Sequence, residues 1–304
     1  QEAGPMAFDV DKNGDVTALF LPQYAEFFGP DVRLSAVGNQ DGDGALTLDT
    51  FALDTRALRL NGTAALNSDG WPTLLDVTGD IADPNGTPVL LPSGGGDTRI
   101  AGAELDVQYD ASAGDALAGR IDITGLDRAD VQARALALTL DGTLSGDVNA
   151  IGTLNTRIDL AASGLELSDP ALARAIGTVV RGGLNIAYTE ETPLRLSDIG
   201  LSGAAWTLGG NATIDSFSDA FATDFDVSLD TPDLAAFADL AGVALEGAGT
   251  LAARGSAALG GFFDVTITGE TNDLAIGVAQ ADALLASTTS LDLAARRDET
   301  GTYL

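Results

Sequence analysis

Histidine and cysteine are both absent from the 304 residues of this chain. Without them the sequence contains no Ser-His-Asp or Cys-His catalytic group, no thiolate or imidazole metal ligand, no CxxC redox pair and no disulfide. Acid–base chemistry would rest on carboxylates alone, and it needs two of them in different environments. The adjacent pair Glu190-Glu191 precedes Pro193, which indicates a solvated acidic turn. We therefore expect that the chain is not an enzyme, and that it has no catalytic residue, no metal site and no cofactor.

Basic residues are scarce. Fifteen lysines and arginines stand against 45 aspartates and glutamates, so the net charge is −30 at pH 7. Such a charge repels nucleic acid and anionic lipid head groups, and we expect no nucleic-acid partner. Two explanations of the charge remain open: a solvated acidic surface, as in a salt-tolerant organism, and a surface that steers a cationic partner.

Long apolar runs are missing as well. No run approaches the roughly 18 residues that cross a bilayer as a helix, and we expect no signal peptide within this sequence. A strand pattern begins at the final residues Tyr303 and Leu304. We interpret the sequence as a segment of a longer protein, or a processed form of one, and we expect membrane contact only through parts of the parent protein outside this segment.

Hydrophobic residues nevertheless make up 45% of the chain. Over much of its length they alternate with Asp, Thr, Asn and Arg, which is the period of strands with one apolar face. Strands recur every 10–16 residues or roughly so, the rhythm of an all-β meander. The strongest hairpin signal is Asn13-Gly14, and it predicts two strands that turn there within residues 7–20.

A unit of one short helix and one strand also recurs. In residues 231–255 a cap at Thr231 and apolar residues at helical spacing predict a helix that stops at Gly242. From Val243 onward the apolar period changes to 2, which predicts a strand. Similar units occupy residues 22–38, 169–188 and, more loosely, 280–296.

A longer repeat with an offset of 148 residues overlies the short one. Residues of about 29–64 match residues 177–212 in an unbroken register that keeps apolar and glycine identities. Such a repeat indicates a quasi-one-dimensional stack in which each module packs mainly on its neighbours. We therefore treat residues 1–304 as one continuous array, and we expect the proline- and glycine-rich stretch 82–98 to be a loop inserted in it.

Two acidic motifs resemble the first half of an EF-hand loop, because oxygen ligands stand at alternate positions before a glycine. They are Asp9–Asn13 and Asn39–Asp43. The closing glutamate is missing from both, since Phe20 and Thr50 occupy its position. Plain β-turns are the favoured interpretation, and weak cation sites are the alternative.

The apolar stripe of the strands fits two architectures. One is a closed core, as in a β-sandwich or solenoid. The other is a long sheet curled into a trough whose apolar face stays open, and such a face would imply an apolar partner because soluble proteins rarely expose so large a patch. An outer-membrane barrel is disfavoured, since Trp71 and Trp206 are isolated and form no aromatic girdle.

The segments Leu60–Ala64 (LNGTA) and Asp233–Gly242 (DLAAFADLAG), the order of elements and the acidic alternating strands resemble the TamB/AsmA-like family of Gram-negative bacteria, most closely its alphaproteobacterial type. The likeness is one of pattern and runs along nearly the whole chain. We expect the given sequence to be an internal segment, without the family's N-terminal anchor and C-terminal domain. The resemblance implies a mostly β fold: an elongated, repetitive antiparallel sheet curled into a hydrophobic groove of the β-taco type, with a few short amphipathic helices that plug or rim it.

The resemblance also implies a function. The expected protein is a periplasmic bridge, anchored by its parent chain in the inner membrane, that carries phospholipid acyl chains in its groove between the inner and outer membranes. A TamA-like outer-membrane barrel is the implied protein partner, and a role in outer-membrane protein assembly is implied too. The residues expected to line the groove are the inward aliphatic and aromatic set: Leu46, Leu48, Leu58, Leu60, Leu136, Leu138, Leu140, Leu194, Leu196, Leu208, Leu251, Phe263, Val265 and Ile267.

Three other functions stay open at this point. A structural or adhesive acidic β-repeat protein would have a closed core. A chaperone-like scaffold would bind unfolded β-rich clients at its exposed edge strands. A carboxylate-only glycosidase would need two carboxyl groups in one cleft.

Overall fold

The computed structural model describes residues 5–19, 21–92, 97–215, 222–258, 261–298 and 301–303. These residues form one long antiparallel sheet of twenty strands with four short α-helices, so the predicted mostly-β class is confirmed. Within each unit the described part of the sheet is neither strongly curled nor closed on itself. By its internal contacts the chain divides into two compact units.

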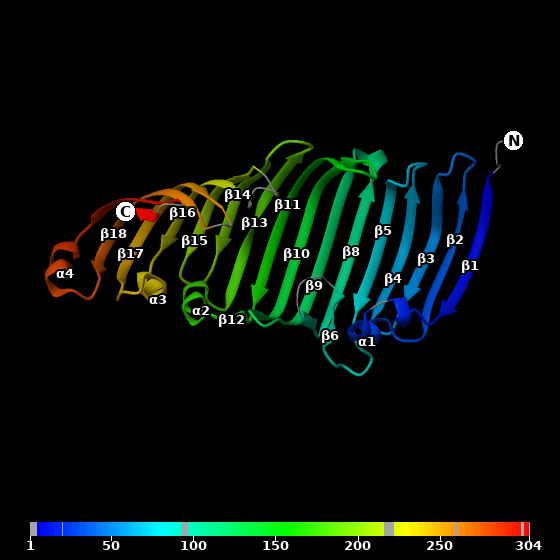
Figure 1. Cartoon of the computed structure of the whole chain (residues 1–304), viewed down its shortest axis with the longest axis horizontal. Coiled ribbons are helices and arrows are strands. Elements are labelled where there is room, and N and C mark those ends of the chain that lie inside the picture. Colours follow the sequence, from blue (N-terminus) through cyan, green and yellow to red (C-terminus); the bar gives the residue numbers. More distant parts are fainter. Residues whose placement is uncertain are drawn as a thin grey trace. The chain divides into compact units, whose positions relative to one another are not determined.

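Unit 1 consists of Gln1–Ile158 with Ala162–Gly164. Its strands pair antiparallel in chain order, except that β5 pairs directly with β8 and the short strands β6 and β7 pair with each other (Figure 1). Those two short strands belong to the excursion between β5 and β8. Part of the predicted loop 82–98, the glycine run Gly94–Gly96, lies outside the described residues. The strands are β1 (Met6–Gly14), β2 (Val32–Gln40), β3 (Leu46–Asp54), β4 (Leu58–Leu66), β5 (Pro72–Ile81), β6 (Val89–Leu90), β7 (Arg99–Ile100), β8 (Gly102–Asp110), β9 (Ala116–Asp127) and β10 (Val131–Gly146).

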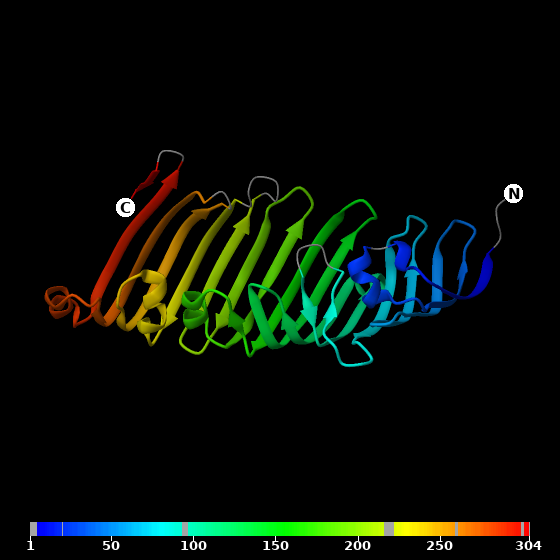
Figure 2. The ribbon, with the colours of Figure 1, turned by 60° about the horizontal axis from the view of Figure 1, so that its bottom comes forward.

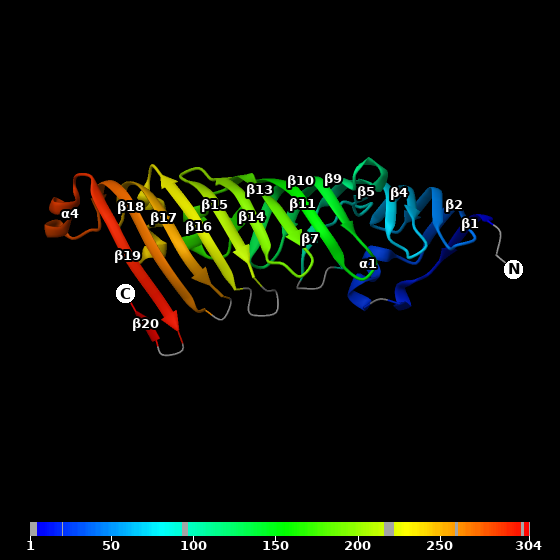
Figure 3. The same ribbon diagram turned by 90° about the horizontal axis from the view of Figure 1, so that it is seen from above.

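Unit 2 consists of Asp159–Ala161 with Leu165–Leu304. Its long strands also pair antiparallel in chain order and form a single layer (Figure 3). They are β13 (Val179–Thr189), β14 (Leu194–Ser202), β15 (Thr207–Ile214), β16 (Thr223–Thr231), β17 (Glu246–Ala257), β18 (Phe263–Ala275), β19 (Thr289–Asp298) and β20 (Gly301–Tyr303). The division between the units falls around β11 (Ile151–Ser163) and β12 (Glu166–Leu167).

The predicted hairpin at Asn13-Gly14 is wrong. Residues Met6 to Gly14 form one extended strand, and its partner is β2: Asn13 pairs with Arg33, and Gly14 with Val32. Residues Thr17–Leu19 form a 3₁₀ turn. Nine residue pairs with β2, which place Phe8 and Val10 beside apolar and glycine neighbours on one face, outweigh the local turn preference.

Strand pairing arranges the side chains in rows that cross the sheet. We call a row a set of residues paired directly from strand to strand, because such residues lie on the same face. Three rows with apolar character cross unit 1 from β1 to β10, and they start at Phe8, Val10 and Lys12. The Lys12 row continues through Leu34, Leu53, Leu60, Gly79, Leu105, Ile121 and Leu138. The neighbouring row on the opposite face is Ser35, Ala52, Asn61, Thr78, Asp106, Arg120 and Thr139, so the two faces of unit 1 differ sharply in polarity.

Unit 2 has the same division into faces. Four rows of apolar character cross it from β14 to β19, starting at Leu194, Leu196, Ile199 and Leu201. The Leu201 row continues through Leu208, Leu229, Leu251, Gly269 and Leu291. The adjacent row on the other face is Ser202, Thr207, Asp230, Thr250, Glu270 and Ser290. We refer to the two sides as the apolar face and the polar face of each unit.

The 148-residue repeat is visible in the strand register. The pairs Phe51–Gly62 and Leu53–Leu60 of unit 1 correspond to Ile199–Gly210 and Leu201–Leu208 of unit 2 at that offset. A β-bulge also recurs, between Leu48 and Phe51 in β3 and between Leu196 and Ile199 in β14. Each unit therefore holds one copy of the same hairpin.

Glycine allows the close approach of strands within this repeated hairpin. Gly210 has φ +147°, a backbone conformation that essentially only glycine adopts. A Cβ on Gly210 would overlap the carbonyl oxygen of Asp226 on the next strand, and a Cβ on Gly62 would overlap that of Asp76. Both glycines lie on the apolar face, where their large cross-strand neighbours fill the space that a side chain would take.

The short helices end where glycine was predicted to stop them. The helices α1 (Ala25–Phe28), α2 (Pro170–Ile176) and α3 (Ala238–Ala241) are followed by Gly29, Gly177 and Gly242, each with positive φ. The fourth, α4 (Ala279–Leu285), ends at Ala286. The cap of the 231–241 segment is Asp233 rather than Thr231, and β17 begins at Glu246 rather than Val243. Within unit 2 the helices α2, α3 and α4 lie at the same end of the strands (Figure 2).

Candidate functional site

The apolar faces contain all fourteen residues that were expected to line a groove. Leu60, Leu138 and Leu140 of unit 1 and Leu208, Leu251 and Ile267 of unit 2 lie in the rows already described. The remaining members extend the same faces along the strands. All fourteen are only partly buried: none belongs to the closed interior, and none is fully exposed.

Alternation of exposure shows which side of the strands is shielded. In β16 the side chains of Phe225, Val227 and Leu229 are half-buried, while the intervening Asp224 and Asp226 are exposed. The same pattern runs along β18 from Phe263 to Thr271. The apolar side chains therefore shield one another within a single layer, and no second layer covers them in the part of the chain that the structure describes.

The total accessible surface area of the chain is consistent with apolar faces that no second layer covers. The chain exposes 17506 Å², whereas two compact domains of half its mass would together expose about 14,400 Å². The described residues include eleven buried apolar side chains, and five of these are alanines. A sequence with 45% hydrophobic residues thus buries very few large side chains. Large uncovered apolar surfaces are uncommon in soluble proteins, so the apolar faces are the candidate functional site.

Helical segments cover only one end of each apolar face. In unit 1 the buried ring of Phe27 on α1 packs with Ala57 and Val89, and Leu58 and Ile81 at the strand ends pack against this cluster. In unit 2 the buried Leu234 lies beside Gly249 of β17. The helices therefore close an end of the face and leave the central rows open.

Tyr109 is the most deeply buried aromatic side chain on the apolar face of unit 1, with 3% of its surface exposed. Its hydroxyl donates a hydrogen bond to Asp115 Oδ1 at 3.3 Å. Burial, with a smaller effect of the nearby Asp115 carboxylate, raises the pKa of the phenol. The side chain is therefore a neutral part of the apolar face.

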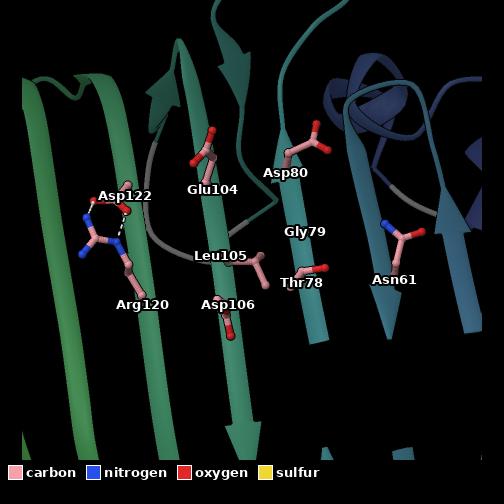
Figure 4. A pocket seen from close by; sticks show the side chains of 9 residues that line it. All are labelled: Asn61, Thr78, Gly79, Asp80, Glu104, Leu105, Asp106, Arg120 and Asp122. Carbon is pink, nitrogen blue, oxygen red and sulfur yellow. Dashed lines mark hydrogen bonds and ion pairs between the residues drawn. The ribbon is translucent and has the colours of Figure 1, made fainter. Parts of the chain in front are cut away.

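The polar faces carry the hollows of the structure. Figure 4 shows one of about 410 Å³ in unit 1, where Asp80, Glu104 and Asp122 lie on three neighbouring strands. Arg120 Nη2 donates to Asp122 Oδ1 at 2.9 Å, and Arg59 Nη1 lies 3.4 Å from Asp80 Oδ2. None of these carboxylates is buried. The hollow therefore lacks the shielded acid that a carboxylate-only glycosidase would need.

The two candidate cation motifs take ordinary strand and turn conformations. Asp9 and Asp11 lie within β1, where alternate residues share one face of an extended strand rather than surrounding a loop. Residues Asn39–Asp43 end β2 and enter a turn in which Asp43 Oδ1 accepts from the amide of Ala45 at 3.2 Å. In the described ranges no cluster of three or more acidic side chains is arranged to hold a metal ion.

Comparison of the chain with family models, with curated proteins and with solved structures finds no match. In the described residues no helix has the length and apolar character needed to cross a membrane. The apolar faces therefore remain the feature from which a function can be argued.

Two residues of these faces were not anticipated from the sequence. Lys12 lies in a row with Leu34, and Arg297 lies in the row of Leu194 and Phe263. They are the charged side chains in the seven rows of the described sheet. The sequence did indicate their positions, because Lys12 in β1 and Arg297 in β19 fall at the alternate positions that apolar residues occupy in those strands.

Proposed function

We propose that this chain is a lipid-binding segment of a periplasmic bridge protein, in which phospholipid acyl chains lie on the apolar faces of a β-groove. The observation that carries the proposal is the continuity of apolar rows that no other layer covers. The resemblance to the TamB/AsmA-like family supports the compartment, the transport of phospholipid between the inner and outer membranes, a TamA-like partner and a part in outer-membrane protein assembly. A stronger curl of the sheet around bound lipid belongs to the same proposal.

Dimensions of the faces suit acyl chains. A row across the eight paired strands of unit 1 spans about 34 Å at a strand spacing of about 4.8 Å. One leaflet of a bilayer has a hydrocarbon thickness of about 15 Å, so a row is longer than an acyl chain. A chain that contacts the face on one side only would gain roughly half of the about 0.8 kcal/mol per buried CH₂. Fourteen methylenes then contribute about 5–6 kcal/mol, which suits reversible binding.

A structural array with a closed core is the alternative that the geometry supports less well. It would require the large apolar side chains to be buried, and those of the central rows are half-exposed.

Native mass spectrometry of the purified chain, with lipid extraction, tests the proposal. We expect bound phospholipid in the unmodified protein. Val265→Asp should reduce it strongly, whereas Thr266→Asp, which adds the same charge to the polar face of the same strand, should not. A folded, lipid-free protein that also fails to bind added phospholipid would overturn the proposal.

A second measurement avoids the risk that Val265→Asp unfolds the chain. In a background of Trp71→Phe and Trp206→Phe, a single tryptophan at Leu208 or at Thr207 reports on opposite faces of β15. Phospholipid with brominated acyl chains should quench the tryptophan of Leu208→Trp and leave that of Thr207→Trp bright. Equal quenching of the two would contradict binding to the apolar face.

A further inference from the structure

The charged residues in these seven rows are both cations. Lys12 lies on β1 in the row that continues through Leu34, and Arg297 lies on β19 beside Phe263. Carboxylates outnumber basic side chains three to one in the sequence, 45 against 15, so an unselected charge would be acidic more often than basic. Both side chains are exposed. Each unit thus presents one cation at an outer strand of its apolar face.

Several arginines of the polar faces form ion pairs with aspartate on the same or a neighbouring strand, as Arg254 does with Asp226 at 2.9 Å and Arg296 with Asp298 at 3.2 Å. Within the described ranges no carboxylate forms an ion pair with Lys12 or Arg297. In a chain of net charge −30 these cations are therefore available to an anion from outside the protein.

We propose that Lys12 in unit 1 and Arg297 in unit 2 each bind the phosphate of a separate zwitterionic phospholipid, whose acyl chains lie on the apolar rows of the same unit. This inference rests on the proposed function and names its ligand. Lysine and arginine can lay their aliphatic stems along an apolar surface and keep the charged group at its margin. Contact of that group with a phosphodiester is charge-assisted. The overall negative charge disfavours lipids with a net negative charge, whereas a zwitterionic head group presents its phosphate to the cation and its ammonium group to the surrounding carboxylates.

Affinity for two lipids with the same acyl chains tests the proposal. The probes are a short-chain phosphatidylethanolamine and the corresponding diacylglycerol, which lacks the phosphodiester. The unmodified full chain should bind the phospholipid more tightly. Arg297→Gln and Lys12→Gln should each weaken phospholipid binding about two- to fivefold, as expected for an exposed ion pair, and should leave diacylglycerol binding unchanged. Arg297→Lys should restore most of the difference.

Matched controls are available on the polar face. Arg296→Gln and Arg33→Gln remove the same charge from the neighbouring residue of β19 and from β2, and they should not change the preference for phospholipid. Loss of preference in the controls would show a general charge effect and overturn the proposal. Equal binding of the two lipids by the unmodified chain would overturn it while leaving acyl-chain binding intact.

Failure of the proposed function gives a different result, because neither lipid would then bind. A competition experiment with soluble glycerophosphoethanolamine, the head group without acyl chains, tests whether the acyl chains are needed for binding. Displacement of phosphatidylethanolamine by this head group alone at equal concentration would show a site for a free phosphodiester, and would overturn the role assigned to the apolar rows.

Discussion

Replacing Gly210 with alanine should destabilise unit 2, whereas the same change at the adjacent Gly209 should not. Gly210 has φ +147°, and a Cβ there would overlap the carbonyl oxygen of Asp226 and lie 2.7 Å from Val227 Cα. A Cβ on Gly209 would have its nearest neighbour, the carbonyl oxygen of Ile199, at 3.6 Å, an ordinary contact. The two positions are neighbours on β15, so the comparison isolates backbone conformation and close approach.

The expected changes in the free energy of unfolding have opposite signs in the two variants. A residue held in a glycine-only region costs about 1–3 kcal/mol, and the clash with β16 adds to this cost, so we expect Gly210→Ala to lower the free energy of unfolding by about 3 kcal/mol. Gly209→Ala restricts the conformations of the unfolded chain, and it should therefore raise the free energy of unfolding by about 0.4–1 kcal/mol. With a urea m-value of about 2 kcal/mol/M, the midpoint should fall by about 1.5 M in the first variant and rise by about 0.2–0.5 M in the second.

Urea unfolding followed by tryptophan fluorescence measures this difference. Trp206 belongs to unit 2, and its indole N–H donates to the carbonyl oxygen of Ile176 at 3.2 Å. A Trp71→Phe background therefore makes fluorescence report on unit 2 alone. Equal midpoints for the two variants would refute the close strand approach at Gly210, and with it the argument that glycine shapes the repeated hairpin.

Two further predictions concern charge. Hydrogen bonds lower the pKa of Asp83. The largest effect comes from the backbone amide of Asn85, which donates to the carboxylate at 2.8 Å, and Arg56 Nη2, which donates at 3.0 Å, contributes as well. Because the folded-state pKa lies below the ordinary value of about 3.9, Asp83 stabilises unit 1 above that pH, and this contribution disappears as the pH falls through the lower folded value. Acid unfolding of Asp83→Asn, followed by Trp71 in a Trp206→Phe background, should be less steep below about pH 4, and an unchanged curve would contradict the assignment. Added sodium chloride should raise the urea midpoint of the unmodified chain, since screening relieves the self-repulsion of a net charge of −30, and a midpoint that falls with salt would show that ion pairs outweigh repulsion.

Local chemistry alone predicted much of this protein. The alternation of apolar and polar residues indicated antiparallel strands, since that period depends on nothing beyond the strand itself. Gly29, Gly177 and Gly242 marked the helix ends, because the positive φ that each adopts is a conformation that glycine alone takes without strain. The expected lining residues, such as Leu138 and Val265, lie on the apolar faces for the same reason.

Tertiary structure decided the rest, because it depends on residues far apart in the chain. The partner of β1 is β2 and not the segment after Asn13-Gly14, since pairing over nine residues outweighs one turn. The bulge between Leu48 and Phe51 sets which later residues of β3 share the apolar face, and parity counted along the sequence cannot show it. The sequence of a single strand shows which of its faces is apolar, but it does not show whether a second layer packs on that face. That the large apolar side chains of the central rows stay partly exposed could therefore be recognised only in the folded sheet.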